Sequence, residues 1–348
     1  MRAALYLDAG NVIVDDVPDP GIQLPTDAVV RVVRSCVCGS DLWAYRDTFK
    51  REPRSRLGHE FIGTVEEVGG EVTTLAPGDF VVAPFSYGCG SCWWCLEGLP
   101  TSCPHSGTWG GGDHDGAQGA ALRVPYADAN LVVIPGGVAA YDDAGLLDLL
   151  ATSDVMATGL HGAVMAGVAE GGTAVVVGDG AVGLCAVLGA VDLLKADRVI
   201  LLSRNPARQA VGRQFGATEI VEARGEDAKQ AVLDLTDGHG AASVVEAVGT
   251  PDSWQTALDV VSDGGQIGAV GVPHTAPTIQ TMTLLGRNLG VRVGIAPVRR
   301  YLPELVERVV SGTLAPGVVF DLTLPLEQTP DAYAAMDRRE AIKVALVP

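Results

Sequence analysis

Four of the chain's seven cysteines lie in one short stretch, GCGSCWWCLEGLPTSC, at residues 88–103. Their spacing is C-x2-C-x2-C-x7-C, and four thiolates so close together suit tetrahedral Zn²⁺ or an iron–sulfur cluster. A disulfide pair and a redox-active C-x-x-C compete with this interpretation. Disulfides do not persist in the cytosol, and thioredoxin-like motifs belong at a strand–helix junction, not in an irregular loop. We therefore predict a structural zinc, closed to substrate because the protein supplies all the ligands: Cys89, Cys92, Cys95 and Cys103.

A catalytic metal needs an open coordination position and mixed ligands, and two other stretches offer them. These are Cys38 in SCVCGSDLW and His59 in LGHEFIG. Alone, each is more typical of a buried thiol or a hydrogen-bonded imidazole. Together they indicate a second metal site, because Asp41 is placed to orient the imidazole of His59. Ser40, two residues from the thiol, is placed to pass a proton.

A glycine turn follows the apolar stretch TAVVV. Gly178, Gly180 and Gly183 form G-x-G-x-x-G between this stretch and an apolar helix. In a dinucleotide site, the first glycine makes the tight turn, the second admits the pyrophosphate and the third allows helix and strand to pack closely. The helix N-terminus then faces the phosphates. The motif alone is weak evidence, but its strand–turn–helix–strand setting predicts dinucleotide binding.

The end of the next strand predicts which dinucleotide binds. An NAD site usually has Asp or Glu there for the ribose 2′-hydroxyl, whereas this strand ends in Ser203, Arg204 and Asn205. Arg204 is able to hold a 2′-phosphate in a charge-assisted fork, with Arg208 one turn further on to assist. The alternative is an arginine that is merely solvated at a helix start. We predict a preference for NADP(H).

Composition limits the possible partners and the location of the chain. With 348 residues, 47% hydrophobic and 19% charged, it is long enough for two globular domains. A net charge of −18 opposes binding to nucleic acid or to an anionic membrane. No run of 18 apolar residues is present, and the start MRAALYLDAG lacks the apolar region of a signal peptide. We expect a cytoplasmic protein.

The texture of the sequence changes along the chain. Residues 1–135 read as short strands with an irregular insertion at 86–125. The stretch 143–168 reads as helical, and alternating apolar strands and helices follow it. Such alternation predicts a parallel sheet buried on both faces. From about 292 the pattern reads as irregular up to a final strand, AIKVALV.

Taken together, these motifs show that the chain resembles the zinc-dependent medium-chain alcohol dehydrogenases over essentially its whole length. The family fingerprint G-H-E-x2-G-x5-G-x2-V is present, and so are C-G-S-D, the cysteine lobe and the glycine turn, in the family's order. The matching positions of the first two motifs are Gly58, His59, Glu60, Gly63, Gly69 and Val72, and residues 38–41.

This resemblance implies an α/β architecture with two parts. A GroES-like β-rich catalytic domain would comprise residues 1–153, including the structural zinc lobe at 86–125, and would be completed by residues 292–348. A Rossmann cofactor domain with a doubly wound parallel sheet would occupy residues 154–291.

The resemblance also implies roles for particular residues. Asp154 matches the third zinc ligand of one branch of the family, the NADP-linked secondary-alcohol dehydrogenases that have Asp at this position. Ser203 and Arg204 also match the residues of this branch. Glu60 matches a carboxylate that becomes a transient zinc ligand. The resemblance also implies that the backbone of Val270, Gly271 and Val272 binds the nicotinamide amide. Phe85 and Trp109 would line the substrate pocket, and Arg338 or Arg339 would contact the pyrophosphate.

One position departs from the family pattern. Many members have His three residues after the relay hydroxyl, where this chain has Trp43. The proton then leaves Ser40 through the cofactor ribose and water, or another group substitutes for the histidine. Trp43 is also a possible pocket wall.

The expected function is hydride transfer between NADP(H) and an alcohol/ketone or aldehyde pair, with two zinc ions per chain and Ser40 taking the proton. Polyol, sugar or threonine dehydrogenation on the same scaffold remains open, as does a zinc-independent quinone or enoyl reductase. The last generally lacks the catalytic ligands. A non-catalytic zinc module that binds nucleic acid does not suit the acidic composition. The family implies a homodimer or homotetramer.

Overall fold

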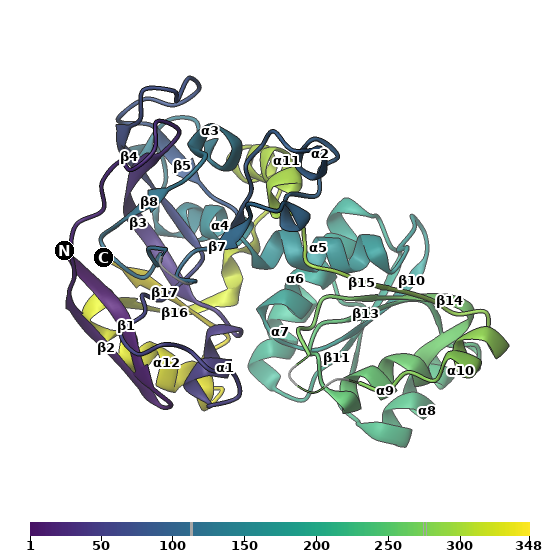
Figure 1. The fold of residues 1–348 in the computed structure, drawn as a ribbon. Helices are drawn as coiled ribbons and strands as arrows, with labels where there is room; N and C mark the ends of the chain where they lie inside the picture. Colours follow the sequence, from purple (N-terminus) through teal and green to yellow (C-terminus); the bar gives the residue numbers. More distant parts are fainter. Residues whose placement is uncertain (112–113, 274, 276) are drawn as a thin grey trace. The chain divides into compact units, whose positions relative to one another are not determined.

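The chain forms two compact units, seen in a computed structural model that describes residues 1–111, 114–273, 275 and 277–348 (Figure 1). The first unit joins Met1–Asp154 to Pro297–Pro348, and the second is Val155–Ala296. The expected boundaries were 153/154 and 291/292. The second of these falls inside a strand of the second unit, Gly290–Val293, so the return to the first unit comes later than expected. Two residues of the predicted zinc lobe, 112–113, lie outside the described residues.

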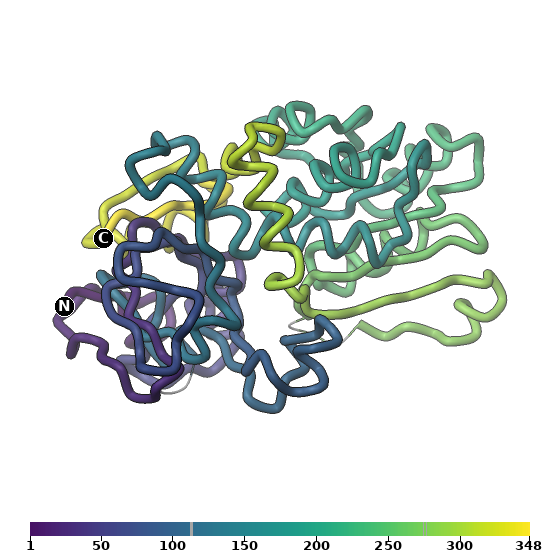
Figure 2. Tube along the Cα trace, turned by 90° about the horizontal axis from the view of Figure 1, so that it is seen from above, coloured from purple at the N-terminus to yellow at the C-terminus, as the bar shows by residue number. Residues whose placement is uncertain are grey.

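The first unit is built around a seven-stranded sheet that uses both ends of the chain. Its order is β16-β17-β3-β4-β5-β9, and β8 also pairs with β3. The last strand, β17, runs antiparallel to β3 and parallel to β16, so the C-terminal segment completes a sheet begun near the N-terminus (Figure 2). Two further sheets have two strands each, β1 with β2 and β6 with β7. The strands and helices are β1 (Arg2–Asp8), β2 (Asn11–Asp16), β3 (Ala28–Val37), α1 (Asp41–Tyr45), β4 (Phe61–Val68), β5 (Phe80–Val82), β6 (Ser86–Tyr87), α2 (Trp93–Leu96), β7 (Gly107–Thr108), β8 (Ala121–Val124), α3 (Ala127–Asn130), β9 (Val132–Val133), α4 (Asp143–Thr152), α11 (Val298–Val310), β16 (Phe320–Pro325), α12 (Thr329–Asp337) and β17 (Lys343–Val347).

The second unit is a parallel six-stranded sheet in the order β12-β11-β10-β13-β14-β15. In chain order this is 3-2-1-4-5-6, the Rossmann arrangement, which confirms the predicted α/β fold. Helices cover both faces (Figure 1). Its elements are α5 (Val155–Met165), β10 (Thr173–Val177), α6 (Ala181–Leu188), which continues as a π-helical turn (Gly189–Leu193), β11 (Arg198–Leu202), α7 (Pro206–Gln214), β12 (Glu219–Val221), α8 (Gly225–Leu235), β13 (Ala241–Glu246), α9 (Pro251–Val260), β14 (Val261–Ala269), α10 (Thr281–Gly286) and β15 (Gly290–Val293).

Two sequence-based expectations about helices need correction. The stretch 143–168 is two helices, α4 and α5, with Ser153 and Asp154 between them. The irregular reading after 292 missed α11 and α12. In α11 the buried positions Val298, Leu302, Leu305, Val306 and Val309 recur at helical spacing, but Pro303 interrupts the pattern. Among the described residues, no helix is long and apolar enough to cross a bilayer.

Candidate active site and metal centres

Four predicted site residues come together within the first unit. Cys38 directly follows β3, His59 and Glu60 directly precede β4, and Asp154 follows α4. One possible ligand atom from each lies within 4.8 Å of the others. Because β3 and β4 pair antiparallel, Ser35 opposite Phe61, the end of one strand meets the start of the next. The break between α4 and α5 brings the carboxylate of Asp154 to the same point.

The separations of these atoms fit a zinc ion. His59 Nε2 lies 3.4 Å from Asp154 Oδ2, and Cys38 Sγ lies 3.9 Å from the same oxygen. Zinc–ligand bonds of about 2.0–2.3 Å at tetrahedral angles place the ligand atoms about 3.3–3.6 Å apart. One thiol, one imidazole and one carboxylate therefore match the donor set of a zinc site with three protein ligands, within a small adjustment of Cys38.

A hydrogen-bonded layer holds these ligands in place. Asp41 Oδ2 accepts a hydrogen bond from the backbone N–H of Cys38 (2.9 Å), and Asp41 Oδ1 lies 3.5 Å from His59 Nδ1. The amide of Gln118 donates to Asp41 Oδ2 (3.3 Å), and Tyr333 donates to Gln118 Oε1 (3.1 Å). The predicted orienting role of Asp41 agrees with this geometry. No sequence signal pointed to Gln118 or Tyr333, which lie far from Asp41 in the chain.

The site has a negative field. Burial disfavours the imidazolium form of His59, but the charges of Asp41 and Cys38 and hydrogen bonds to Asp154 and Asp41 raise the pKa of His59 well above its usual value. Burial likewise opposes ionisation of Asp41, yet His59 and the N–H of Cys38 lower the pKa of Asp41. The field that favours a protonated imidazole also favours a divalent cation.

Glu60 forms a buried ion pair at the back of this cluster. Lys343 Nζ on β17 lies 2.7 Å from Glu60 Oε1, and this oxygen is 3.7 Å from His59 Nε2. Among the described residues, Glu60 Oε2 has no hydrogen-bond partner. The pair leaves one carboxylate oxygen available beside the ligands. The sequence analysis did not single out Lys343, which lies in the predicted final strand AIKVALV.

The predicted substrate-pocket residues have different surroundings. Phe85 lies edge-on to His59 with ring centroids 6.2 Å apart, beside the metal ligands. Ser40 and Trp43 are half-buried around α1. Trp109 is only 3% exposed, packs against Phe61 and donates from Nε1 to the carbonyl of Pro84 (2.7 Å). Trp109 is therefore a residue of the sheet core, and its predicted role as a pocket wall is not supported.

The four predicted structural-zinc cysteines also converge, with their Sγ atoms within 4.8 Å of one another. Backbone N–H groups of Cys89 and His105 point to Cys103 Sγ at 3.4 and 3.3 Å. Burial opposes ionisation of Cys89, but donors from Ser91 and Cys92 lower the pKa of this thiol to about 6. Burial and the neighbouring thiols raise the pKa of Cys95 to about 12. A cation would relieve this repulsion, so the cluster fits a zinc site with four cysteine ligands.

The glycine turn in the second unit has the geometry predicted for it. Gly178 has φ +125°, a conformation that favours glycine. A Cβ on Gly183 would lie 2.0 Å from the carbonyl oxygen of Gly178, so helix and turn pack too closely for a side chain. A Cβ on Gly180 would meet nothing within 4 Å, which leaves the turn open at the position predicted to admit a pyrophosphate.

The predicted 2′-phosphate residues divide into an exposed one and two buried ones. Arg204 is exposed. Ser203 is buried and donates from Oγ to Asp179 Oδ2 (2.9 Å). Arg208, 6% exposed, donates from Nη1 to the backbone carbonyl of Asp179 (2.9 Å). The guanidinium of Arg208 thus binds the glycine turn, which does not support its predicted contact with a 2′-phosphate. Asp179 was not singled out from the sequence.

The other predicted cofactor contacts stay predictions. The N–H groups of Val270 and Gly271 donate to the carbonyl of Glu246, and Val272 is exposed. Arg338 forms an ion pair with Glu340 (2.7 Å).

Comparison with known proteins decides the family. The model described as alcohol dehydrogenase GroES-like domain matches residues 24–136, and the model for zinc-binding dehydrogenase matches residues 181–311. A "probable zinc-binding alcohol dehydrogenase" of Mycobacterium tuberculosis is 37% identical over 353 residues, which cover 100% of this chain and 89% of the relative. The chain belongs to the zinc-dependent medium-chain alcohol dehydrogenases.

Solved structures of this alcohol dehydrogenase family agree in fold. An alcohol dehydrogenase from Thermus sp. ATN1 matches with a TM-score of 0.91 and 35% identity, covering 100% of this chain and 99% of that one. A structure from Sinorhizobium meliloti 1021 that contains NADP matches with a TM-score of 0.85 and 25% identity, covering 100% and 99%. The predicted GroES-like and Rossmann domains are confirmed, and the chain is an oxidoreductase of the zinc-type alcohol dehydrogenase class.

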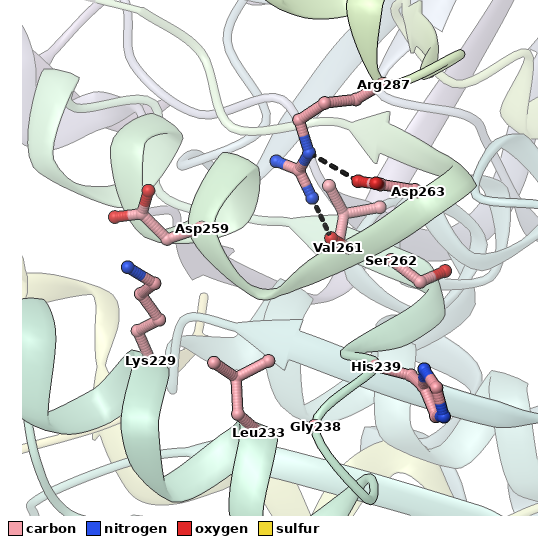
Figure 3. A pocket seen from close by; sticks show the side chains of 9 residues that line it. All are labelled: Lys229, Leu233, Gly238, His239, Asp259, Val261, Ser262, Asp263 and Arg287. Carbon is pink, nitrogen blue, oxygen red and sulfur yellow. Dashed lines mark hydrogen bonds and ion pairs between the residues drawn. The ribbon is translucent and has the colours of Figure 1, made fainter.

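A surface hollow of about 650 Å³ in the Rossmann unit of this dehydrogenase contains none of the predicted site residues (Figure 3). Arg287 lines this hollow and donates to Asp263 Oδ1 (2.7 Å) and to the carbonyl of Val261 (2.6 Å). Lys229, at its edge, pairs with Glu226 (2.9 Å). Its cationic groups are thus largely satisfied by the protein itself.

Proposed function

We propose that this alcohol dehydrogenase transfers hydride between NADP(H) and an alcohol/ketone or aldehyde pair at Cys38, His59 and Asp154. The observation that carries the proposal is the convergence of these three side chains from separate segments of the chain, with Asp41 bracing both Cys38 and His59. A purely structural zinc site usually has only Cys and His ligands, whereas here a carboxylate lies beside the thiol and the imidazole.

The residues of the site divide the chemistry among them. Bound zinc would supply Lewis-acid polarisation of the substrate oxygen and lower the pKa of an alcohol. Cys38, His59 and Asp154 would hold the ion, and Asp41 would fix the ring orientation of His59. Ser40 would take the alcohol proton, and Phe85 would limit the space beside His59. Hydride would pass from the substrate carbon to nicotinamide C4, and the reverse direction would reduce the carbonyl.

The preference for NADP(H) rests on the exposed guanidinium of Arg204 next to the buried Ser203 at the end of β11. A strand-end carboxylate is absent here, and the related Sinorhizobium structure contains NADP. Arg204 would form a bidentate contact with a 2′-phosphate.

Zinc content and NADPH turnover together test this function. We expect two zinc ions per chain in the wild type, and oxidation of NADPH with at least one ketone or aldehyde in a panel that includes polyol-, sugar- and threonine-derived carbonyls. Cys38→Ser and His59→Ala should each remove one zinc and reduce kcat/KM about a thousandfold, since a polarising metal contributes several kcal/mol.

Cys36→Ser is the matched control, because this buried thiol lies on β3, two residues before Cys38, but outside the ligand cluster. It should keep both zinc ions. A wild type with a single zinc that still reduces quinones or enoyl compounds would replace the proposal with the zinc-independent reductase alternative. Full turnover in Cys38→Ser with only the structural zinc would reject the proposed site.

We propose further that the enzyme is a cytoplasmic homo-oligomer, a dimer or a tetramer. All seven cysteines are free thiols, which suits a reducing compartment. The outer edge of the Rossmann sheet supports self-association. Its last strand, β15, pairs only with β14 among the described strands, and Val293 and Ile295 are 62% and 63% exposed. Exposed apolar edge strands pair readily with a second copy.

A further inference from the structure

The glycine turn of the Rossmann unit contains a carboxylate that no dinucleotide phosphate requires. Asp179 stands between Gly178 and Gly180, directly after β10. In the usual motif this position carries no specific role, because the flanking glycines make the turn and admit the pyrophosphate. Here its side chain is turned toward the end of the neighbouring strand, where it accepts a hydrogen bond from Ser203 Oγ at 2.9 Å.

That neighbouring strand end is the adenosine-ribose position of a Rossmann site. β10 and β11 are adjacent and parallel, Val177 opposite Leu202, so their carboxyl ends lie together. In NAD sites an acidic residue at the end of the second strand binds the ribose 2′-hydroxyl. Ser203 occupies this position, and the carboxylate of Asp179 is one hydrogen bond away from it. The acidic group is therefore displaced onto the glycine turn and not missing from the site.

Further contacts hold Asp179 in this place. Arg208 Nη1 donates to its backbone carbonyl (2.9 Å) and lies 3.8 Å from its Oδ1. Asn205 caps α7 by accepting hydrogen bonds from the N–H groups of Ala207 and Arg208, which fixes the backbone position of Arg208 in the first turn of the helix. Gln209 donates to the carbonyl of Ser203 (3.0 Å). The carboxylate is thus braced by an arginine that is itself buried.

We propose that Asp179 is a specificity-determining residue of the cofactor site, which favours a dinucleotide with a free 2′-hydroxyl and opposes a 2′-phosphate. This inference rests on the proposed dinucleotide binding. Asp179 accepts a hydrogen bond from a ribose hydroxyl, but it repels a phosphate that carries about −2 charges. Arg204 acts in the opposite sense. The balance between Asp179 and Arg204 sets the ratio of NADPH to NADH affinity and keeps it modest.

The test is binding of NADPH and NADH to the purified full-length enzyme, measured by nucleotide fluorescence. Asp179→Asn keeps the shape and the bond from Ser203 but removes the charge. We expect it to raise the NADPH-to-NADH affinity ratio about tenfold, because the repulsion between the carboxylate and a 2′-phosphate is lost. Arg204→Gln should lower the same ratio. Asp179→Ser, also uncharged, replaces the asparagine variant if that variant does not fold.

Asp234→Asn is the matched charge control. Asp234 lies near the end of α8, which leads to the amino end of β13, whereas the glycine turn follows the carboxyl end of the parallel strand β10. Its partner Gln230 can still donate to the amide oxygen. It should leave the ratio unchanged. If the wild type binds both dinucleotides and Asp179→Asn weakens or strengthens both equally, Asp179 only braces the turn and the inference is overturned. A wild type that binds neither dinucleotide would instead overturn the proposed function.

Discussion

Lys343 and Glu60 form an ion pair that is almost completely buried: Nζ and Oε1 are 2.7 Å apart, and the two residues are 1% and 0% exposed. Lys343 also lies 3.4 Å from the carbonyl of Val37 and 5.6 Å from the centre of the Phe320 ring. The pair joins the last strand of the chain to the segment that carries the His59 ligand. Its two partners therefore depend on each other for both stability and site geometry.

Removal of one partner should destabilise the protein strongly. Lys343→Met would leave a buried carboxylate without its counter-charge, which costs about 3–5 kcal/mol. We expect a marked fall in the thermal midpoint of the zinc-loaded enzyme. The thermal midpoint of Lys343→Arg, which keeps the charge, should fall much less. The double variant Glu60→Gln/Lys343→Met should recover part of the fall, because no buried charge is left unpaired. Equal midpoints for Lys343→Met and the wild type would show that the pair contributes nothing.

Asp41 should control how tightly the catalytic zinc is held. Asp41→Asn removes the charge that faces His59 Nδ1, and loss of such an orienting group typically weakens metal affinity about 10–100-fold. A chelator titration followed by zinc analysis should show one ion leaving earlier than in the wild type, while the ion held by the four clustered cysteines stays. Asp47→Asn is the control, since Asp47 is exposed just after α1 and its side chain pairs only with Lys50 among the interactions described. Unchanged zinc retention in Asp41→Asn would contradict the orienting role.

Stability should depend on pH through Asp148. Burial raises the pKa of Asp148 from 3.8 to about 6, only partly offset by the hydrogen bond from the N–H of Gly317. Between about pH 4 and 6 the folded state thus holds more protons than the unfolded state, so stability falls as pH rises through this window. Allowing for solvent screening, the effect on the free energy of unfolding is about 1 kcal/mol, or about 1–2 °C in Tm for a chain of 348 residues.

The comparison that isolates this effect is Asp148→Asn at about pH 5 and about pH 7.5, on either side of the folded-state pKa. From about pH 5 to about pH 7.5 the Tm of the variant should fall less than the Tm of the wild type, because the amide has no charge to desolvate. Parallel pH profiles for the two proteins would exclude Asp148 as the source.

Self-association should depend on the exposed edge of the Rossmann sheet. Val293→Lys places a charge at the exposed end of β15 and should reduce the mass seen by light scattering to a half for a dimer or a quarter for a tetramer. Leu24→Lys changes another exposed apolar residue away from this sheet and should leave the mass unaltered. A wild type that already has monomer mass would contradict the proposed oligomer.

The sequence predicted the parts of the site that depend on local spacing. The four thiols converge because three of them lie within one short loop, and the glycine turn follows from steric limits on Gly178 and Gly183 that a pattern expresses directly. Cys38 and His59 were also found, because each is followed by polar neighbours with identifiable uses. Asp154 was reached only through family resemblance, since a single aspartate in a helical stretch carries no signal of its own.

The parts that sequence reasoning missed depend on distant contacts. Gln118 lies 77 residues from Asp41, and Lys343 lies 283 residues from Glu60. Asp179 was passed over because only the glycines of its turn were considered for the phosphates, and a carboxylate for the ribose was sought only after the next strand, whereas a parallel sheet brings the two strand ends together. Trp109 was assigned to the substrate pocket through the resemblance alone, and its packing in the sheet core could not be read from the sequence.

The order in which the strands enter the sheets has a consequence for biosynthesis. The Rossmann unit is contiguous, so all of its strands have been made once Ala296 has emerged from the ribosome. The sheet of the first unit is instead complete only after β17 (Lys343–Val347) has been made, because this strand lies between β16 and β3. At about 5–20 residues per second, the nascent N-terminal strands wait for tens of seconds without their central neighbour. During that interval the unpaired edges of these N-terminal strands are exposed, and we expect chaperones to bind them.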